Sequence, residues 1–457
     1  MASKDPQIQQ LEQELERLRS QGNHQFDSYQ TVLTRRYCSD AMSSLFSQRS
    51  RIGIWRKLWL ALAESERALG IDTISMEAIE EMRSHLYVTD SDFEIARVEE
   101  KKRRHDVMAH VHAYGIVAPA AAGIIHYGAT SCFVTDNAEA AAQWVQDLMF
   151  DLQSIEQVRH DLKFRGAQGT TGTQASFLEI FQGDSAKCDQ LNSLLCAKLG
   201  FPSCYDISTQ TYTRKVDLMI ANAVCGLGAT AQKICGDIRH LANWKEIEEP
   251  FEKSQIGSSA MAYKRNPMRS ERVYSLAREL MSKPASFANT LSDQWAERTL
   301  DDSAIRRMDI PDMFLLAEAI LLGLDNITDG LVVYPKRIQS RVMEELPFMI
   351  TESIIMKLVA KGASRQEAHE QIRVLSHEAG AVVKNEGKPN DLVSRIKSNE
   401  FFKPIWGELD NMLDPKLYTG RSVEIVERYC DVGGPVDLKL VPYMKYITET
   451  RTAELNV

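Results

Sequence analysis

The chain has 457 residues, of which 44% are hydrophobic and 26% charged, the composition of a globular protein with more than one domain. Its 63 acidic residues outnumber 54 lysines and arginines, and the net charge of −9 excludes a general nucleic-acid binder. The sequence has no run of 18 apolar residues and no apolar leader, so we expect neither a membrane span nor a secretory signal. Eight cysteines without a CxxC pair predict reduced thiols in a cytoplasmic protein.

Two helical patterns occur in the first part of the chain. Residues 7–21 alternate apolar and polar side chains over about two heptads, which favours a short solvated helix. Residues 50–69 place Trp55 and Trp59 on one apolar stripe, and Gly70 should end that helix. The N-terminal part is therefore predicted to be helical.

The middle of the chain predicts a bundle of long helices. Residues 216–243 repeat apolar side chains every three to four positions, a seam that requires a partner helix. Residues 269–297 carry a second pattern, and residues 308–331 are so apolar that their helix should be buried on several sides. The best strand signal is LVVYP at 331–335. We predict an all-α fold with an N-terminal helical domain (1–130), a central long-helix bundle (131–333) and a C-terminal helical domain (334–457).

The segment GSSAMAYKRNPMRSER, Gly257–Arg272, does not fit a helix core. Its small and cationic side chains suit a mobile loop that closes on an anion. Ser258, beside Lys264 and main-chain N–H groups, could act there as a base. A basic solvated loop is an equally good interpretation from the residues alone.

The segment RTLDDSAIRR, 298–307, could clamp a phosphate. In a helix, Ser303 and Arg307 are one turn apart and share a face, and arginine binds phosphate with two parallel N–H groups. Pairing of the arginines with Asp301 and Asp302 explains the same spacing equally well.

Three further segments carry polar groups. RRHDVMAH, 103–110, places His105 between a cation and an acid, although a charged helix surface is the alternative. GATS, 128–131, offers hydroxyls and N–H groups at a helix start, which suits a carboxylate. GAQGTTGTQ, 166–174, lacks the GK[ST] of a phosphate-binding loop. The histidines at 105, 110 and 112 have no further ligands nearby, so we expect no metal.

The loop GSSAMAYKRNP resembles the signature of the fumarase/aspartase superfamily. RHDVMAH, GATS, TQTYTRKVD, EEPFEK and RTLDDSAIRR are more specifically similar to the adenylosuccinate lyase family, from about Tyr37 to about Gly420. The resemblance implies an all-α homotetramer with shared active sites and no metal or organic cofactor. It implies a β-elimination that releases fumarate, from adenylosuccinate to give AMP or from succinylaminoimidazole carboxamide ribotide to give AICAR.

The resemblance also assigns roles to residues of this chain. Ser258 would remove the Cβ proton, Lys264 would stabilise the resulting aci-carboxylate, and His105 would orient the substrate. The other residues expected to contact the nucleotide phosphate, the succinyl carboxylates or the pocket are Arg36, Tyr37, Arg104, Asp106, Thr130, Ser131, Gln210, Arg272, Arg298, Ser303 and Arg307.

The chain departs from the family pattern at two places. Ala262 replaces a proline of the family loop, so ordering that loop should cost a few tenths to about 1 kcal/mol more. The second departure is a missing Thr-His segment, whose histidine protonates the leaving nitrogen. Here GATSCFVTDN runs directly into AEAAAQWVQDL, without a helix of about 30 residues and a loop. The alternative to an active lyase is therefore a catalytically impaired splice-type variant that binds ligand or assembles with full-length subunits.

Overall fold

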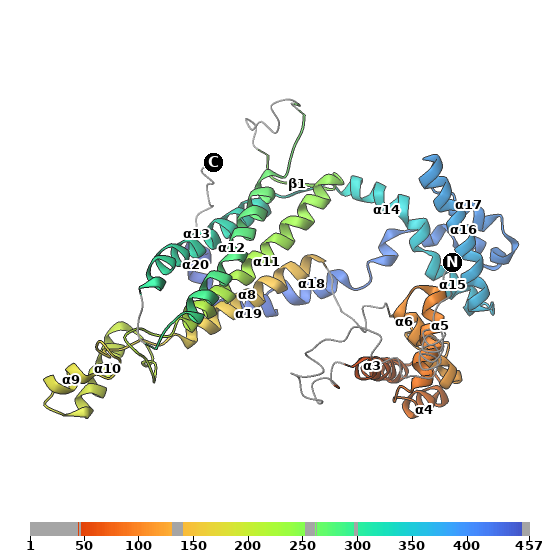
Figure 1. The fold of residues 1–457 in the computed structure, drawn as a ribbon. Helices are drawn as coiled ribbons and strands as arrows, with labels where there is room; N and C mark the ends of the chain where they lie inside the picture. The colour runs from red at the N-terminus through yellow and green to blue at the C-terminus, as the bar shows by residue number, and fades with distance from the viewer. Residues whose placement is uncertain are drawn as a thin grey trace, which may run out of the picture. The chain divides into compact units, whose positions relative to one another are not determined.

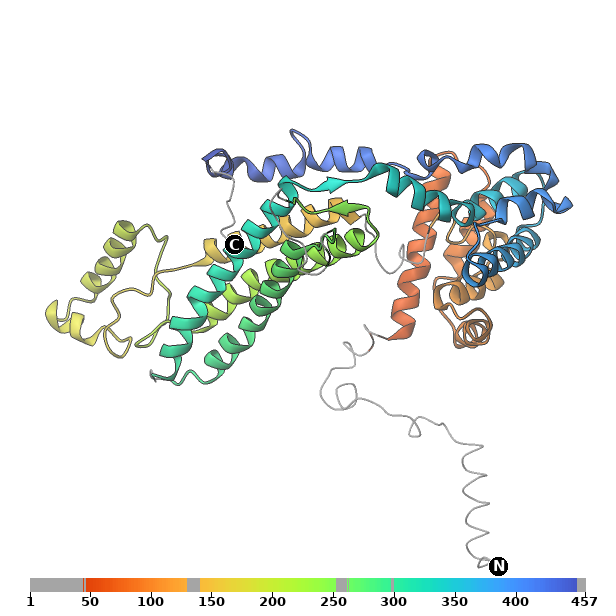
Figure 2. The ribbon, with the colours of Figure 1, turned by 90° about the horizontal axis from the view of Figure 1, so that it is seen from above.

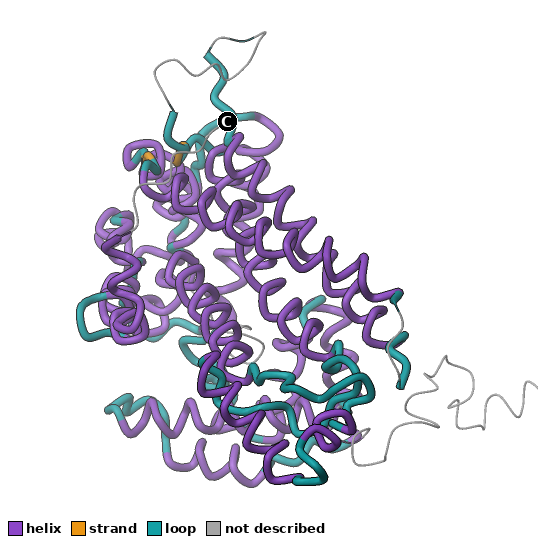
Figure 3. Tube along the Cα trace, turned by 90° about the vertical axis from the view of Figure 1, so that its left-hand side faces the viewer, coloured by secondary structure: helices purple, strands orange, loops and turns teal. Residues whose placement is uncertain are grey.

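The computed structural model describes residues 44, 47–129, 140–251, 261, 263–296 and 300–449 (Figure 1). The chain separates into two compact units, Met1–Ala138 and Glu139–Val457. Helices dominate both, and the described residues contain one sheet of two short strands (Figure 3). The predicted all-α class is confirmed, and the three-domain division stays a prediction. The predicted helix at 7–21 lies outside the described residues.

The first unit packs its helices around two tryptophans. α3 (Gln48–Ala68) begins after Ser47, whose hydroxyl accepts a hydrogen bond from the Ser50 amide, and Gly70 follows its end at φ +93°. Trp55 and Trp59 are buried, as the stripe predicted. The other elements of this unit are α4 (Met76–Ser84), α5 (Asp90–Arg103), α6 (Asp106–Val117) and the 3₁₀ turn η3 (Pro119–Ala121).

A buried ion pair joins α3 to α5. The Arg56 guanidinium lies 3.3 Å from the Asp92 carboxylate, and both side chains are almost fully buried. Arg56 also donates to the carbonyls of His85 and Tyr87. Asp92 accepts from the amide of Thr89, which caps α5. A buried guanidinium is tolerated here because it has both a counter-charge and carbonyl acceptors.

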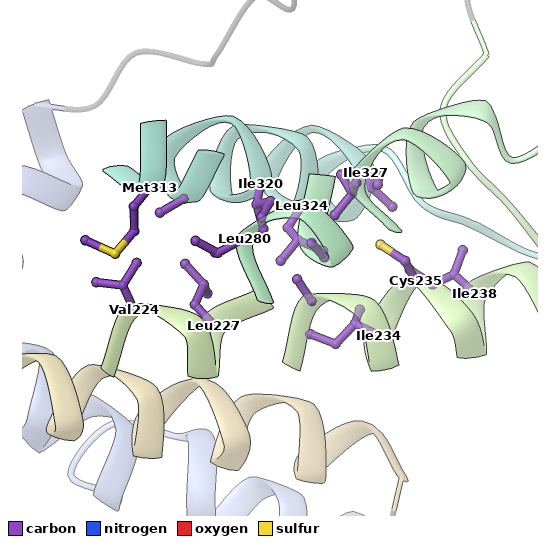
Figure 4. Packing of buried hydrophobic residues seen from close by; sticks show 14 of the residues in the cluster. Val224, Leu227, Ile234, Cys235, Ile238, Leu280, Met313, Ile320, Leu324 and Ile327 are labelled. Carbon is purple, nitrogen blue, oxygen red and sulfur yellow. The ribbon is translucent and has the colours of Figure 1, made fainter. Parts of the chain in front are cut away.

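Long antiparallel helices form the core of the second unit (Figure 4). α11 (Lys215–Asn243) packs on α12 (Met268–Ser292), and α12 packs on α13 (Asp301–Asp329). Gly228 of α11 faces Leu280 of α12, whereas Gly236 faces Tyr274, so these helices run in opposite directions. The predicted seam is confirmed by its buried members Val224, Leu227, Ala231, Ile234 and Ile238.

α11 is long and apolar enough, by length and composition, to cross a membrane. Its apolar seam is covered instead by α12 and α13, and α8 (Ala140–Asp161) packs along another face. Asp237 on α11 accepts from Trp144 of α8 and from Lys233. Packing against three helices thus accounts for the apolar character of α11.

The predicted strand at 331–335 is confirmed. β2 (Val332–Val333) pairs antiparallel with β1 (Ile247–Glu248), and the Tyr334 amide donates to the carbonyl of Glu246. The pair lies at the end of the bundle where α11 stops and the chain turns toward α12 (Figure 1).

The prediction that α13 is buried on several sides is wrong for this single chain. Met313, Ile320 and Leu324 are buried against α11 and α12. The neighbouring Phe314 and Leu315 are 50% and 62% exposed, because nothing in the described part of the chain covers that side. Met308, Leu321 and Leu322 extend the exposed apolar surface.

The rest of the second unit is helical. A separate hydrophobic cluster lies downstream of the bundle, and its buried members include Leu346, Ile354, Leu358, Phe402 and Ile405. The remaining elements are α9 (Ala175–Ile180), α10 (Ser185–Leu199), α14 (Pro335–Met349), α15 (Thr351–Ala360), α16 (Arg365–Glu386), α17 (Leu392–Lys397), η4 (Glu400–Glu408), η5 (Asp410–Leu413), η6 (Pro415–Tyr418), α18 (Ser422–Cys430), α19 (Pro435–Leu440), η7 (Val441–Tyr443) and α20 (Met444–Glu449).

The C-terminal helices return to α8 (Figure 2). The Glu156 carboxylate on α8 forms an ion pair with Lys439 and accepts a 2.6 Å hydrogen bond from the Tyr443 hydroxyl. These contacts join α8, the first helix of the second unit, to α19 and η7 near its C-terminal end.

Protonation of His110 should destabilise the first unit in mild acid. His110 lies edge-on to Trp55 and Phe93, and burial lowers its pKa to about 4. In the unfolded chain its pKa is about 6.5, so between these two values the unfolded state binds more protons. We expect the melting temperature to fall as the pH drops from 6.5 toward 4, measured by circular dichroism.

The variant His110→Phe should flatten this dependence. His112→Phe, at an exposed position of the same helix, is the matched control and should keep the slope. Burial also lowers the pKa of His126, which accepts from the Trp59 indole, so some slope should remain in His110→Phe. An unchanged slope in that variant would contradict the assignment.

Candidate active site

Three predicted site residues lie at the end of the bundle where α11 and α13 begin. Gln210 precedes α11, and Ser303 and Arg307 lie one turn apart in the first two turns of α13. The predicted helical spacing of Ser303 and Arg307 is therefore confirmed.

Two ion pairs fasten the start of α11 to the start of α13. Arg214 Nε donates to Asp302 Oδ2 over 2.6 Å, and both side chains are nearly buried. One turn further along each helix, Arg306 Nε donates to Asp217 Oδ2 over 2.7 Å. The Tyr212 hydroxyl donates to Asp217 Oδ1, and burial together with this bond raises the pKa of Tyr212 to about 12. The two helix starts are thus held together by charge as well as by apolar packing.

The pairing of Asp302 bears on the alternative interpretation of the RTLDDSAIRR segment, in which its arginines pair with Asp301 and Asp302. Asp302 is bound to Arg214 and not to an arginine of its own segment. Within the described residues, the side chains of Ser303 and Arg307 have no hydrogen-bond or ion-pair partner. A hydroxyl and a cation on one helix face are what an anion clamp requires, and this role of the segment stays a prediction.

Gln294, just after α12, holds the segment around Gln210. Its side-chain carbonyl accepts from the Arg214 amide over 2.7 Å. Its amide nitrogen donates to the Thr211 hydroxyl and to the Tyr212 carbonyl, at 3.3 and 3.2 Å. The family-like motifs TQTYTRKVD and RTLDDSAIRR contain most of this network, but local spacing did not reveal the pairings across the chain.

Lys264 and Arg272 lie at the opposite end of the bundle, beside the two strands. Glu249, which is 9% exposed, caps α12 by accepting from the amides of Arg269 and Ser270 at 3.0 and 2.6 Å. A carboxylate at a helix N-terminus is favourable because it satisfies free N–H groups and faces the positive end of the helix dipole. The side chains of Lys264 and Arg272 are exposed, and Arg272 lies in the first turns of the helix that Glu249 caps.

Within one copy of the bundle, Lys264 and Arg272 lie far from the residues at the start of α11 and α13. Arg272 lies about 20 residues before the end of α12, which at 1.5 Å per residue is about 30 Å. Gln210 and Ser303 lie at that far end, so Lys264 and Arg272 of this chain cannot meet them on one small ligand. The predicted pocket is therefore not assembled within one copy of the second unit.

The first unit contributes a tight turn between α5 and α6. Arg104 caps the end of α5 in the left-handed conformation, φ +55°, which is strained for a residue with a side chain. His105 caps α6, with its Nδ1 3.5 Å from the Met108 amide nitrogen and 3.7 Å from Asp106 Oδ1. Arg104, His105 and Asp106 are all exposed, so this turn presents a cation, an N–H donor and a carboxylate side by side.

The other predicted site residues lie outside the described residues: Arg36, Tyr37, Thr130, Ser131, Ser258 and Arg298. Ala262 is also outside them. In the described parts of the chain, no three His, Cys, Asp or Glu side chains are grouped to hold a metal.

A cavity of about 850 Å³ lies between the end of α8 and the loop before α11. Two of its lining charges are paired, Glu156 with Lys439 and Lys163 with Asp206. It contains none of the predicted site residues, so the cavity does not mark the candidate active site.

Known sequences resemble the chain over most of its length. A family model described as "Adenylosuccinate lyase C-terminus" matches residues 347–429, and one described as "Lyase" matches residues 137–282. The adenylosuccinate lyase of Saccharomyces cerevisiae is 49% identical over 94% of this chain and 99% of its own length. The enzyme of the same name from Schizosaccharomyces pombe is 48% identical over 93% and 98%. The chain belongs to the adenylosuccinate lyase family.

Solved structures support the fold of this family member. A fumarate lyase from Mesorhizobium sp. BNC1 superposes with a TM-score of 0.52 at 18% identity, over 87% of this chain and 99% of its own. A 3-carboxy-cis,cis-muconate lactonizing enzyme from Pseudomonas putida gives 0.50 at 18% identity, over 91% and 100%. The predicted superfamily fold is confirmed.

Removing Arg214 from its buried ion pair with Asp302 should lower the free energy of unfolding. Arg214→Met leaves Asp302 buried without its counter-charge, and we expect a loss of about 3–5 kcal/mol in unfolding free energy. Urea denaturation measures this loss. Arg373→Met, which breaks an exposed pair with Glu370, is the control and should cost under about 1 kcal/mol. Equal effects of the two substitutions would contradict the role given to Arg214.

Proposed function

We propose that the chain catalyses the adenylosuccinate lyase reaction. It cleaves a C–N bond by β-elimination, releasing fumarate from adenylosuccinate to leave AMP, and from succinylaminoimidazole carboxamide ribotide to leave AICAR. Family membership over 94% of the chain is the observation that carries this proposal. The unpartnered Ser303 and Arg307 support it, because both substrates carry a phosphate that needs such a clamp.

The proposed reaction needs one proton removed and one delivered. Ser258, as an alkoxide, takes the proton from the succinyl Cβ, and the electron pair moves into the neighbouring carboxylate as an aci-carboxylate. Lys264 stabilises that dianion, a charge present only along the reaction path. The C–N bond then breaks as fumarate forms, and the leaving nitrogen takes up a proton from water. His105 orients the substrate.

We propose that the active site is shared between copies of the chain in a homotetramer. The two groups of predicted residues stand about 30 Å apart along α12, so a second copy must bring its loop end to the Gln210 end of the first. The exposed apolar side of α13, with Phe314 and Leu315, offers a surface for this association.

We also propose that the segment with the general-acid histidine is absent from this chain. The alignment with the S. cerevisiae relative has 482 positions, whereas 94% of 457 residues is about 430. About 50 aligned positions therefore have no residue here. The S. pombe alignment, with 476 positions over 93% of the chain, leaves about the same number. A deficit of this size matches the helix and loop missing between GATSCFVTDN and AEAAAQWVQDL.

Activity of the purified chain tests both proposals together. Loss of a general acid typically costs 10²–10⁴-fold, so kcat should be lower than that of the S. cerevisiae relative by about this factor. The absorbance change on conversion of adenylosuccinate to AMP measures turnover, and Ser258→Ala is the control. Turnover no higher than that control would contradict lyase activity in the chain alone. Turnover equal to the relative's would contradict the missing acid.

Mixed assemblies test the shared site and the impaired-variant alternative. The chain is refolded with the S. cerevisiae enzyme whose loop serine has been changed to alanine, so that neither partner alone has both proton-transfer groups. If sites are shared, some mixed sites take the serine from one copy and the histidine from the other, and activity should rise above the sum of the separate proteins. Native mass spectrometry shows whether mixed tetramers form. Mixed tetramers without any gain in activity would count against shared sites.

A further inference from the structure

The glycine-rich loop at residues 166–174 is an unusual stretch of backbone. Gly166, Gly169 and Gly172 have φ of +83°, +73° and +81°, and Gln174 has φ +58°. The loop is fastened internally, because the Gln174 amide donates to the Gln168 carbonyl and its side chain to the Ala167 carbonyl. A segment with this many left-handed residues has one defined shape, which glycine makes possible at little steric cost.

Arg165 ties this loop to the segment that carries Gln210. One guanidinium nitrogen donates to the Gly169 carbonyl and to the Thr209 carbonyl, each at 3.0 Å. Arg165 is half-buried and has no carboxylate partner among the described residues, and burial lowers its pKa. The guanidinium therefore donates hydrogen bonds to main-chain carbonyls, one in the loop and one directly before Gln210.

Gly172 packs against the same segment. A Cβ at this position would overlap the Ser208 carbonyl oxygen and lie 2.7 Å from Thr209 Cα. These are backbone atoms, which cannot turn away as a side chain could. A residue larger than glycine must therefore push residues 208–209 aside.

The backbone at Gln210 is consequently fixed by contacts to the residues before and after it. Arg165 and Gly172 fix the residues before it, and Gln294 fixes Thr211 after it. The Gln210 side chain itself has no hydrogen-bond partner among the described residues, so its amide is left available.

We propose that Arg165 and Gly172 are positioning residues that set the place of the Gln210 amide in the substrate pocket. The contact of Gln210 with substrate rests on the proposed function, whereas the coupling between loop and Gln210 rests on the contacts above. Displacements near 1 Å at a binding group cost up to about 100-fold in rate. The loop thus contributes to catalysis without touching the substrate.

The structural coupling is tested without any activity measurement. Hydrogen exchange, followed by mass spectrometry on peptides covering residues 206–213, is compared between Gly172→Ala and Gly183→Ala. Gly183 has φ +85° and open space around the Cβ position, so both variants introduce the same backbone strain but only Gly172→Ala displaces residues 208–209. We expect faster exchange of these peptides in Gly172→Ala alone. Equal exchange in the two variants would overturn the proposal.

The functional consequence is tested by a double-mutant cycle on kcat/KM for adenylosuccinate. Gly172→Ala should lower it about 10- to 100-fold, Gly183→Ala should not, and Gly172→Ala added to Gln210→Ala should cause little further loss. Arg165→Met should behave like Gly172→Ala, and Arg165→Lys, which keeps a cationic donor, should recover part of the loss. Additive losses in the double variant would overturn the route through Gln210. No turnover in the unmutated chain would count against the proposed function, while the exchange result would still decide the coupling.

Discussion

The length of α12 is the constraint on which the candidate site depends. The helix has 25 residues, about 37 Å, and the predicted site residues stand at both of its ends. A rigid helix cannot bring its own ends together. The proposed pocket therefore joins the beginning of α12 in one copy of the chain to its far end in another.

Each end of the bundle is held by buried polar groups rather than by apolar packing alone. At one end the Arg214–Asp302 and Arg306–Asp217 pairs fix two helix starts, and at the other the Glu249 carboxylate caps α12. Charged groups are expensive to bury, and they specify position because they tolerate few alternative partners. Ser303 and Arg307, which are expected to bind substrate, directly follow the ion-paired Asp302 and Arg306 in α13.

Local patterns predicted much of the fold. The seam at 216–243 identified α11, the tryptophan stripe identified α3, and LVVYP identified β2, because each depends on side chains close in sequence. The pairing of Arg214 with Asp302 could not be predicted in this way, since 88 residues separate the two. Nor could spacing show that one side of α13 stays exposed, because an apolar pattern does not say whether the same chain or another copy covers it. The site roles came from family resemblance, and all of them stay predictions.

The bond between Glu156 and the C-terminal helices has a consequence for synthesis on the ribosome. Glu156 belongs to the first helix of the second unit, yet its partners Lys439 and Tyr443 are translated more than 280 residues later. Until they emerge, α8 lacks part of its final packing, although α11 is already available to it. The second unit therefore completes this contact only near the end of translation, long after α8 itself has been synthesised.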